Sequence, residues 1–497
     1  MNGIIAHTPA RRQGGFMLAT VMVLVTVLLA TGIAFMRWSV DESTQSAELV
    51  AATQAYYLGQ MGIVEKGFAW LRSIQASQLP IGETILEGKR VDGYGYYENV
   101  SIVYLPSQTG GDFWTQKRIF RISAVGVVRI PFYTGRQSDY KNVRRKAVLY
   151  VEVRNFADYM YLSDEEMTWF GDRIKFWHGD TLEGRVHSNS QIAIMQDPVF
   201  YDQVSTTETD FWRGSGYNPQ FRGPPPVFRV KAVEIPLVAE NLRATAAQQG
   251  HSYPGGNMTY YARFQGATCK MWKWPTGTEI DSADNWIVTL TENTCIFVDA
   301  PLWMHGQVQG AVTIGSSEIV RLMDDIRYVD ANARTGITPY SSTNIMGIVS
   351  ERDVKIANTV VNGRENSNGL GLNQTNTAFT DIVITAAIVA LGFSFTFENQ
   401  NDPDSGYVSS TIPDDRGQIW LFGSVTQMRR GYVHRSTNSS TGYLKKYKYD
   451  TRLLTKRPPC FFDVTDEEGH ALFNIVQWGQ GMTDQADDAR GNIVRYN

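Results

Sequence analysis

The chain has 497 residues, with 46 basic and 50 acidic side chains and three cysteines. This length predicts two or three domains, and the nearly balanced charge offers no strongly basic surface to nucleic acid or anionic lipid. No two cysteines form a C-x-x-C pair, which argues against a structural zinc site or an iron–sulfur cluster. Abundant aromatic residues and 44 glycines favour turn-rich β structure. We therefore expect no nucleic-acid partner, no metal and no cofactor.

An uncharged apolar stretch, residues 16–36, lies near the N-terminus. As a helix it would be roughly 30 Å long, which is enough to cross the hydrocarbon core of a bilayer. Arg11 and Arg12 precede the stretch, so this flank is expected to stay cytoplasmic while the rest of the chain lies outside. Three interpretations are open. They are a cleaved signal peptide with its cleavage site near Gly32-Ile33-Ala34, an uncleaved signal anchor, and a helix that continues beyond the membrane.

The pattern that follows the apolar stretch favours a continuing helix. Apolar residues recur at steps of three to five positions, at Leu49, Ala52, Tyr56, Met61, Val64, Phe68 and Leu71. This spacing predicts one helix from Phe16 to Ser73, on the order of 85 Å long. Glycines within it are expected to weaken the helix locally without ending it, namely Gly32, Gly59, Gly62 and Gly67.

Gly14-Gly15 stands directly before Phe16, ahead of the apolar stretch rather than after it. This junction resembles the prepilin peptidase site of type IV pilins. Residues 51–71 (AATQAYYLGQMGIVEKGFAWL) resemble the distal half of the N-terminal domain of PilX-type minor pilins. The resemblance implies cleavage after Gly15 by a prepilin peptidase and methylation of the Phe16 amine. It also implies a bacterial inner-membrane protein that later joins other pilins in a surface filament, either a type IV pilus or a type II secretion pseudopilus.

The fifth residue after the expected cleavage site is Thr20. Most major pilins that resemble this chain carry Glu at that position, where it meets the free amine of a neighbouring subunit. A carboxylate and an ammonium attract each other strongly in lipid, and a threonine hydroxyl cannot replace the carboxylate. The departure argues against a self-polymerising major subunit. It is compatible with a minor pilin, at the filament tip or elsewhere.

Beyond the helix, the apolar period changes to that of β structure. The segments ENVSIVYL, RIFRISAVGVVRI and KAVLYVEVRNF alternate apolar and polar residues and predict an antiparallel sheet. From residue 158, short apolar runs alternate with turns, which predicts the stacked coils of a right-handed parallel β-solenoid, with a β-sandwich as second choice. A short helix is expected over 236–249. The phrases GD-x-LEG-x-VHSN and GYLKKYKYDTRLLTKRPP resemble an uncharacterised β-helix domain found behind PilX-like stalks, a family with no activity to carry over.

These patterns together predict an α+β protein with five parts. Residues 1–15 form a leader and 16–75 a transmembrane and stalk helix. An antiparallel pilin-like head covers 76–157, a solenoid-like domain covers 158–460, and 461–497 form a C-terminal tail.

Candidate sites for chemistry are few. His187 and Asn189 lie near Asp180 in sequence and are interpreted as structural turn residues rather than a catalytic cluster. Asp402 and Asp404 give a fragment of a calcium loop, against the alternative of an Asx-rich turn.

The cysteines and one basic stretch complete these candidates. Cys269 and Cys295 could form a disulfide if the chain is exported to a compartment that permits disulfides. The alternative is three unpaired thiols. The basic stretch 445–457 is expected to be a solvated face.

The sequence therefore predicts a structural, non-enzymatic minor-pilin-like subunit that displays a large β-rich head outside the cell. The alternative is a membrane-anchored β-solenoid adhesin or glycan-binding protein. A polysaccharide lyase or hydrolase is disfavoured, because no pair of acid–base residues is visible.

Overall fold

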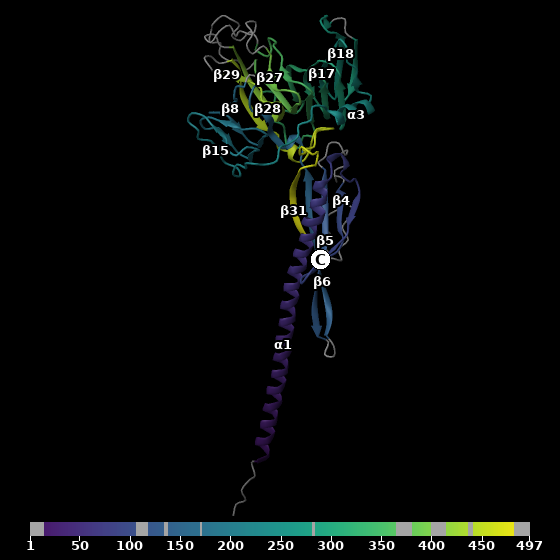
Figure 1. Ribbon diagram of the computed structural model, residues 1–497, viewed down its shortest axis with the longest axis vertical. Coiled ribbons are helices and arrows are strands. Elements are labelled where there is room, and N and C mark those ends of the chain that lie inside the picture. The colour runs from purple at the N-terminus through teal and green to yellow at the C-terminus, as the bar shows by residue number, and fades with distance from the viewer. Residues whose placement is uncertain are drawn as a thin grey trace, which may run out of the picture.

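The computed structural model describes residues 14–105, 118–133, 138–168, 171–280, 284–363, 380–398, 414–435 and 441–481. Figure 1 shows an elongated molecule made of a long helix, a sheet along the upper part of that helix, and a larger β region beyond its end. The expectation of one long N-terminal apolar helix followed by mainly β structure is therefore confirmed.

The chain is helical from Gly14 to Ser73. It forms α1 (Gly14–Gly62), a π-helical turn (Ile63–Phe68) and α2 (Ala69–Ser73), in total about 90 Å of helix. Residues 17–43 are exposed on every side, and this part is long and apolar enough to cross a membrane. One face of α1 becomes buried only from Ala51 onward. The lower half of the helix is therefore left uncovered by the described part of the chain.

A seven-stranded antiparallel sheet packs against the upper half of α1 (Figure 1). Its central strand is β5, which pairs with β6 on one side and with β4 and β3 on the other. The far ends of β5 and β6 run alongside α1 toward its N-terminal part. The strands are β1 (Glu83–Leu86), β2 (Lys89–Val91), β3 (Gly95–Tyr97), β4 (Val100–Leu105), β5 (Ile119–Tyr133), β6 (Ser138–Val153) and β31 (Phe473–Gly481).

Glycines let α1 and the sheet approach backbone to backbone. A Cβ atom added to Gly126 of β5 would overlap the carbonyl oxygen of Ala55 and lie 2.6 Å from the amide nitrogen of Gly59. A Cβ on Gly62 would lie 2.7 Å from the ring of Tyr97. Real carbon atoms cannot come so close, so these positions admit no side chain. The glycines of the helix thus serve packing on the sheet, beyond the local weakening expected from the sequence.

The β region begins with three sets of parallel strands through which the chain winds between residues 159 and 221. Val186 pairs with Val204, and Lys175 pairs with Ala193, so these two returns of the chain have the same interval, while the other returns have similar or longer ones. The sets are β7 (Tyr159–Glu165), β10 (Arg185–Ser188) and β13 (Val204–Thr206); β8 (Lys175–Phe176), β11 (Ala193–Ile194) and β14 (Trp212–Arg213); and β9 (Thr181–Leu182), β12 (Val199–Phe200) and β15 (Gln220–Phe221).

The second part of the β region places two parallel strands in each circuit. Thr294 pairs with Val312 and Leu302 with Val320, so both pairs repeat the interval seen in the first part. One series is β16 (Ser252–Tyr253), β20 (Thr294–Val298), β22 (Ala311–Ser316), β24 (Ile345–Ser350), β26 (Ile382–Ala390), β28 (Asp414–Arg429) and β30 (Thr441–Tyr449). The other is β17 (Met258–Gly266), β21 (Leu302–Val308), β23 (Val320–Tyr328), β25 (Val354–Ile356) and β27 (Phe395–Phe397).

Strand β28 joins the two parts of the β region. Val425 of β28 pairs in parallel with Tyr161 of β7, so a single parallel sheet runs from β16 through β28 and β7 to β13. Other strands lie antiparallel at the margins, namely β18 (Thr268–Pro275), β19 (Asp284–Thr289) and β29 (His434–Arg435). Helix α3 (Glu240–Gln248), which confirms the short helix expected over 236–249, packs on β20 through Arg243 and Phe297.

The C-terminal segment is more than the tail expected over 461–497. Val464 donates a backbone hydrogen bond to Arg154, and β31 then pairs with β6, placing Phe473 opposite Val153. Phe473 packs against Phe68 of the stalk helix, with ring centroids 6.0 Å apart. Residues 473–481 thus complete the sheet beside α1. No local pattern indicated this pairing, because the whole β region separates the two strands in the chain.

The glycine contact predicts a specific defect. Gly126→Ala should lower the free energy of unfolding by about 1–3 kcal/mol, because the new methyl group must push α1 away from β5. Gly82→Ala, a position with no atom within 4 Å of the added Cβ, should change it by less than about 0.5 kcal/mol. Urea unfolding of the full chain in detergent micelles, followed by tryptophan fluorescence, measures both. Equal stability of the two variants would contradict close helix–sheet contact.

Candidate functional site

A cavity of about 530 Å³ lies at the seam where the last circuits of the β region meet the first. One wall is residues 172–182, which include β8 and β9. The opposite wall is formed by residues 430–434 after β28 and by Lys445 and Tyr447 of β30. The cavity thus draws its residues from segments that are far apart in the sequence.

The floor of the cavity is aromatic and held by hydrogen bonds. Gln427 donates its side-chain amide to the hydroxyl of Tyr161 and accepts a hydrogen bond from the backbone of Phe395 at 2.9 Å. The guanidinium of Arg430 lies over Phe176, with its central carbon 3.8 Å from the ring centroid. Burial raises the pKa of the Tyr161 hydroxyl. The floor is therefore neutral at Tyr161 and fixed in shape.

Two ion pairs connect the walls. Arg430 donates to Glu166 at 2.6 Å, and both side chains are almost completely buried. Lys445 contacts Asp180 at 2.7 Å, and the same carboxylate accepts a hydrogen bond from the backbone of Trp177. Burial lowers the pKa of Lys445, and the nearby Asp180 partly offsets this effect. These pairs hold the two walls of the cavity against each other.

Two further cations stand on one wall without such pairing. The guanidinium of Arg173 and the ammonium of Lys175 lie 5.9 and 5.7 Å from the ring centroid of Trp212. Neither makes an ion pair with any acid in the described part of the chain. The cavity therefore carries two cations without an ion pair, and the exposed carboxylate of Asp172 is an unpaired acid on the same wall.

His187 and Asn189 belong to a partly buried hydrogen-bond network, but His187 lies on β10 rather than in the turn that was expected. His187 contacts Ser205 at 2.9 Å and Asn189 at 3.0 Å. Burial lowers the pKa of His187 to about 4, although its hydrogen bond to Asn189 acts in the opposite direction. Asp180, the third residue of the sequence cluster, is instead paired with Lys445.

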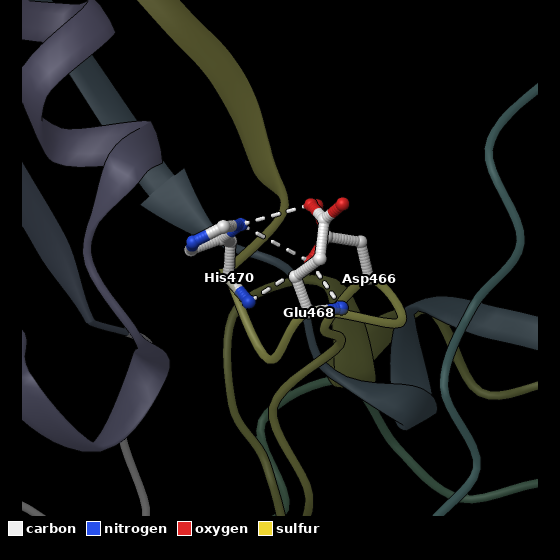
Figure 2. A group of neighbouring side chains, drawn as sticks. All are labelled: Asp466, Glu468 and His470. Carbon is white, nitrogen blue, oxygen red and sulfur yellow. Dashed lines mark hydrogen bonds and ion pairs between the residues drawn. The ribbon is translucent and has the colours of Figure 1, made fainter.

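A second group of polar side chains surrounds a turn between the β region and the stalk. Figure 2 shows Asp466, Glu468 and His470, whose ligand-type atoms lie within 4.8 Å of one another. Asp466 accepts backbone hydrogen bonds from Glu468 and His470, and its other oxygen lies 3.2 Å from the ammonium of Lys231. A cation bound here would have to compete with Lys231 for that carboxylate.

This turn has a structural part in joining the stalk to the β region. The backbone of Ala76, just after α2, donates a hydrogen bond to Gly469 at 3.0 Å. Burial raises the pKa of Asp466, but hydrogen bonds from His470 and Lys231 outweigh burial and hold the pKa below its usual value. The carboxylate is therefore ionised and fixes the turn against the end of the helix.

The possible disulfide between Cys269 and Cys295 is not formed, and the structure agrees with the alternative of three unpaired thiols. All three cysteines are buried free thiols. Cys269 lies on β18, which pairs with β17 and β19 rather than with the strand of Cys295, and its sulfur contacts Met271 at 3.5 Å. Cys295 instead meets Cys460, and the hydrogen bond between the two thiols raises the pKa of Cys295 and lowers that of Cys460.

The remaining predicted positions are dispersed. Gly14, Gly15 and Phe16 form the first residues of α1, and Thr20 lies on its exposed part. Asp402 and Asp404, the expected calcium-loop residues, lie outside the described residues.

The basic stretch 445–457 is only in part the solvated face that was expected: Lys446, Lys448 and Lys456 are exposed, whereas the other three basic residues are paired. Lys445 is paired with Asp180, Arg452 with Asp450 at 2.6 Å, and Arg457 with Asp463 at 2.6 Å, all with little exposure. Sequence reasoning missed these pairs and the cavity. Asp180 and the aromatic rings of the cavity floor are distant from Lys445 in the chain, whereas Asp450 and Asp463 are near their partners but gave no local sign of burial. The alternation of basic and aromatic residues in β30 was the one available sign of a partly buried strand.

Comparison with known proteins adds no relative: no family model, curated protein or solved structure matches this chain.

The buried pair Arg430–Glu166 can be tested by removing one charge. Glu166→Gln should lower the free energy of unfolding by about 3–5 kcal/mol at neutral pH, because Arg430 keeps a buried charge without a counter-ion. The adjacent Glu165→Gln should cost less than about 1 kcal/mol, since Glu165 is partly exposed and 4.0 Å from Arg429. Urea unfolding compares them. A small and equal loss in both variants would show that the seam does not depend on this pair.

The lowered pKa of His187 predicts that the free energy of unfolding depends on pH. The unfolded chain takes up a proton near pH 6.5 and the folded chain only near pH 4, so stability should fall as the pH decreases through this window. The loss attributable to His187 should reach about 3 kcal/mol at most. Unfolding curves at several values between pH 7 and pH 4 measure it. His187→Gln should flatten this part of the profile, and an unchanged slope in the variant would exclude His187 as its source.

Proposed function

We propose that the protein is a minor-pilin-like subunit that is anchored in a membrane by α1, joins a filament and displays the β region outside the cell. The observation that carries this proposal is the division of a single helix into two halves. Residues 17–43 are apolar in their first part and exposed on every side, whereas the half beyond Ala51 is packed on a sheet. An apolar surface of this extent requires lipid or other helices around it.

The sheet and the junction support the same role. Prepilin-like residues Gly14, Gly15 and Phe16 lie at the start of the exposed half, so a peptidase acting there would leave the helix intact. In such a filament, the exposed halves of several subunits would pack together while the sheet and the β region remain at the surface. Thr20 would leave this subunit without the usual carboxylate, so other pilins would provide most of the helical core.

We further propose that the β region is a parallel β-solenoid, a rigid body suited to display. Parallel pairing recurs in both of its parts, at the same short interval in several circuits and at longer intervals in others, and this recurrence supports the interpretation. It speaks against the β-sandwich, in which strands pair antiparallel.

Processing at the N-terminus tests the proposal. The native protein, isolated from the membrane fraction of its own cells, should yield an N-terminal peptide that begins with N-methylated Phe16 in mass spectrometry. Gly15→Val should leave the leader attached, because a bulky residue would block the peptide bond that the peptidase attacks. Gly3→Val, a change elsewhere in the leader, should be processed normally. An intact leader in the unmodified protein, or a start beyond Ala34, would overturn the pilin-like assignment.

The cavity favours a second candidate function, that of a membrane-anchored protein that binds glycans at the cell surface. Its aromatic floor and polar rim are the combination found in small-molecule sites. Deletion of the gene distinguishes the two functions. A minor pilin should affect filament number or length, whereas an anchored glycan-binding protein should leave filaments unchanged and reduce attachment.

A further inference from the structure

We infer that the seam cavity binds an acidic saccharide, with Arg173 and Lys175 holding the acidic group and the aromatic floor supporting the ring. This inference names a ligand class for the display head, and it holds whether α1 is cleaved, methylated or left as a simple anchor. It begins from the shape of the cavity. A volume of about 530 Å³ falls within the range of roughly 300–1,000 Å³ that is usual for small ligands and leaves room for one or two sugar rings.

The floor is already organised for binding. Gln427 is held by hydrogen bonds to Tyr161 and to the backbone of Phe395, and Arg430 is held between Glu166 and the ring of Phe176. These side chains have little freedom left to lose when a ligand enters. A ligand would therefore meet a formed surface rather than one that must first be ordered.

The buried acids of the cavity are already neutralised. Asp180 is paired with Lys445, and Glu166 is paired with Arg430. Neither carboxylate is free to offset the two cations on the wall.

The charge that remains favours an anion. Asp172 stands exposed at the rim, and its carboxylate makes no ion pair with the described residues. Arg173 and Lys175 against this one exposed acid leave a net positive rim. Both cations lie near the face of Trp212, which limits their positions while their charge stays accessible.

The remaining polar groups are mainly donors and hydroxyls. The indole N–H of Trp177, the hydroxyl of Tyr447 and the hydroxyl of Thr181 line the cavity and make no hydrogen bond to other described residues. Burial raises the pKa of Tyr447 well above its ordinary value, so its hydroxyl remains a donor. A ring rich in hydroxyl oxygens and carrying a carboxylate satisfies these donors and the two cations together. A bare anion would satisfy the cations alone.

Binding can be measured with the full chain in detergent micelles. Isothermal titration with a trimer of galacturonate should give saturable binding that weakens as salt is added, since screening reduces the attraction to the two cations. The neutral galactose trimer should bind at least about ten-fold more weakly, because it cannot form the charged hydrogen bonds. Inorganic phosphate at the same concentration should not compete. Equal binding of the neutral trimer would overturn the acidic class, and competition by phosphate would overturn the saccharide class.

Variants locate the site. The double variant Arg173→Gln, Lys175→Gln should weaken binding of the galacturonate trimer by about ten-fold or more. The matched control is Arg222→Gln, which removes an exposed cation that stacks on Tyr201 at 5.3 Å outside the cavity, and it should bind as the unmodified protein does. Equal weakening in the control, or unchanged binding in a double variant of normal stability, would overturn the assignment. Neither result would bear on processing at Phe16, so failure here is separate from failure of the pilin-like role.

Discussion

The close contact between α1 and β5 is the constraint on which the rest of the molecule depends. Gly126 meets the backbone of Ala55 and Gly59 so closely that neither element can slide or rotate without creating a clash. The sheet is thereby held at one height on the helix, and everything built beyond the sheet inherits that position. The apolar half of α1 and the glycine contact lie at separate levels of the helix. Sequence changes in the β region can therefore accumulate without altering how the apolar half of α1 contacts its surroundings.

Farther along the molecule, ion pairs as well as apolar packing fix how neighbouring parts of the structure are joined. Asp463 accepts from Arg118 at 3.1 Å and from Arg457 at 2.6 Å, which ties the start of β5 to the returning C-terminal segment. Arg430 and Glu166 do the same between the two parts of the β region. Such pairs contribute little net stability, because desolvation opposes attraction, but a displaced joint would leave a buried charge alone. We regard them as devices that select one arrangement of the parts.

The elements with strong local signals were predictable and the long-range ones were not. The helix over 16–73, the antiparallel strands after residue 76 and the short helix near Glu240 follow from periodicity and from proline and glycine positions, which act within a few residues. The pairing of β31 with β6, the meeting of Cys295 with Cys460 and the burial of Lys445 depend on segments far apart in sequence. At the candidate cavity the residue types were visible, but no local pattern reports that residues near 175 and 430 share a wall. For the same reason the sequence could not decide between a Cys269–Cys295 disulfide and unpaired thiols, because no local pattern reports which strands the two cysteines would join.

Strand β31 also has a consequence for how the molecule is made. A chain emerging from the ribosome, or through an export channel, can form α1 and the hairpin of β5 and β6 early, but the edge of β6 stays open until residue 481 has appeared. An exposed edge strand is a site for unwanted pairing with other chains, and here it persists while the whole β region is produced. The sheet beside α1 is thus completed late, only after the whole β region has been produced. A truncated product would carry an anchor and an unpaired edge, and would be distinguishable from the finished protein by whatever recognises open β edges in that compartment.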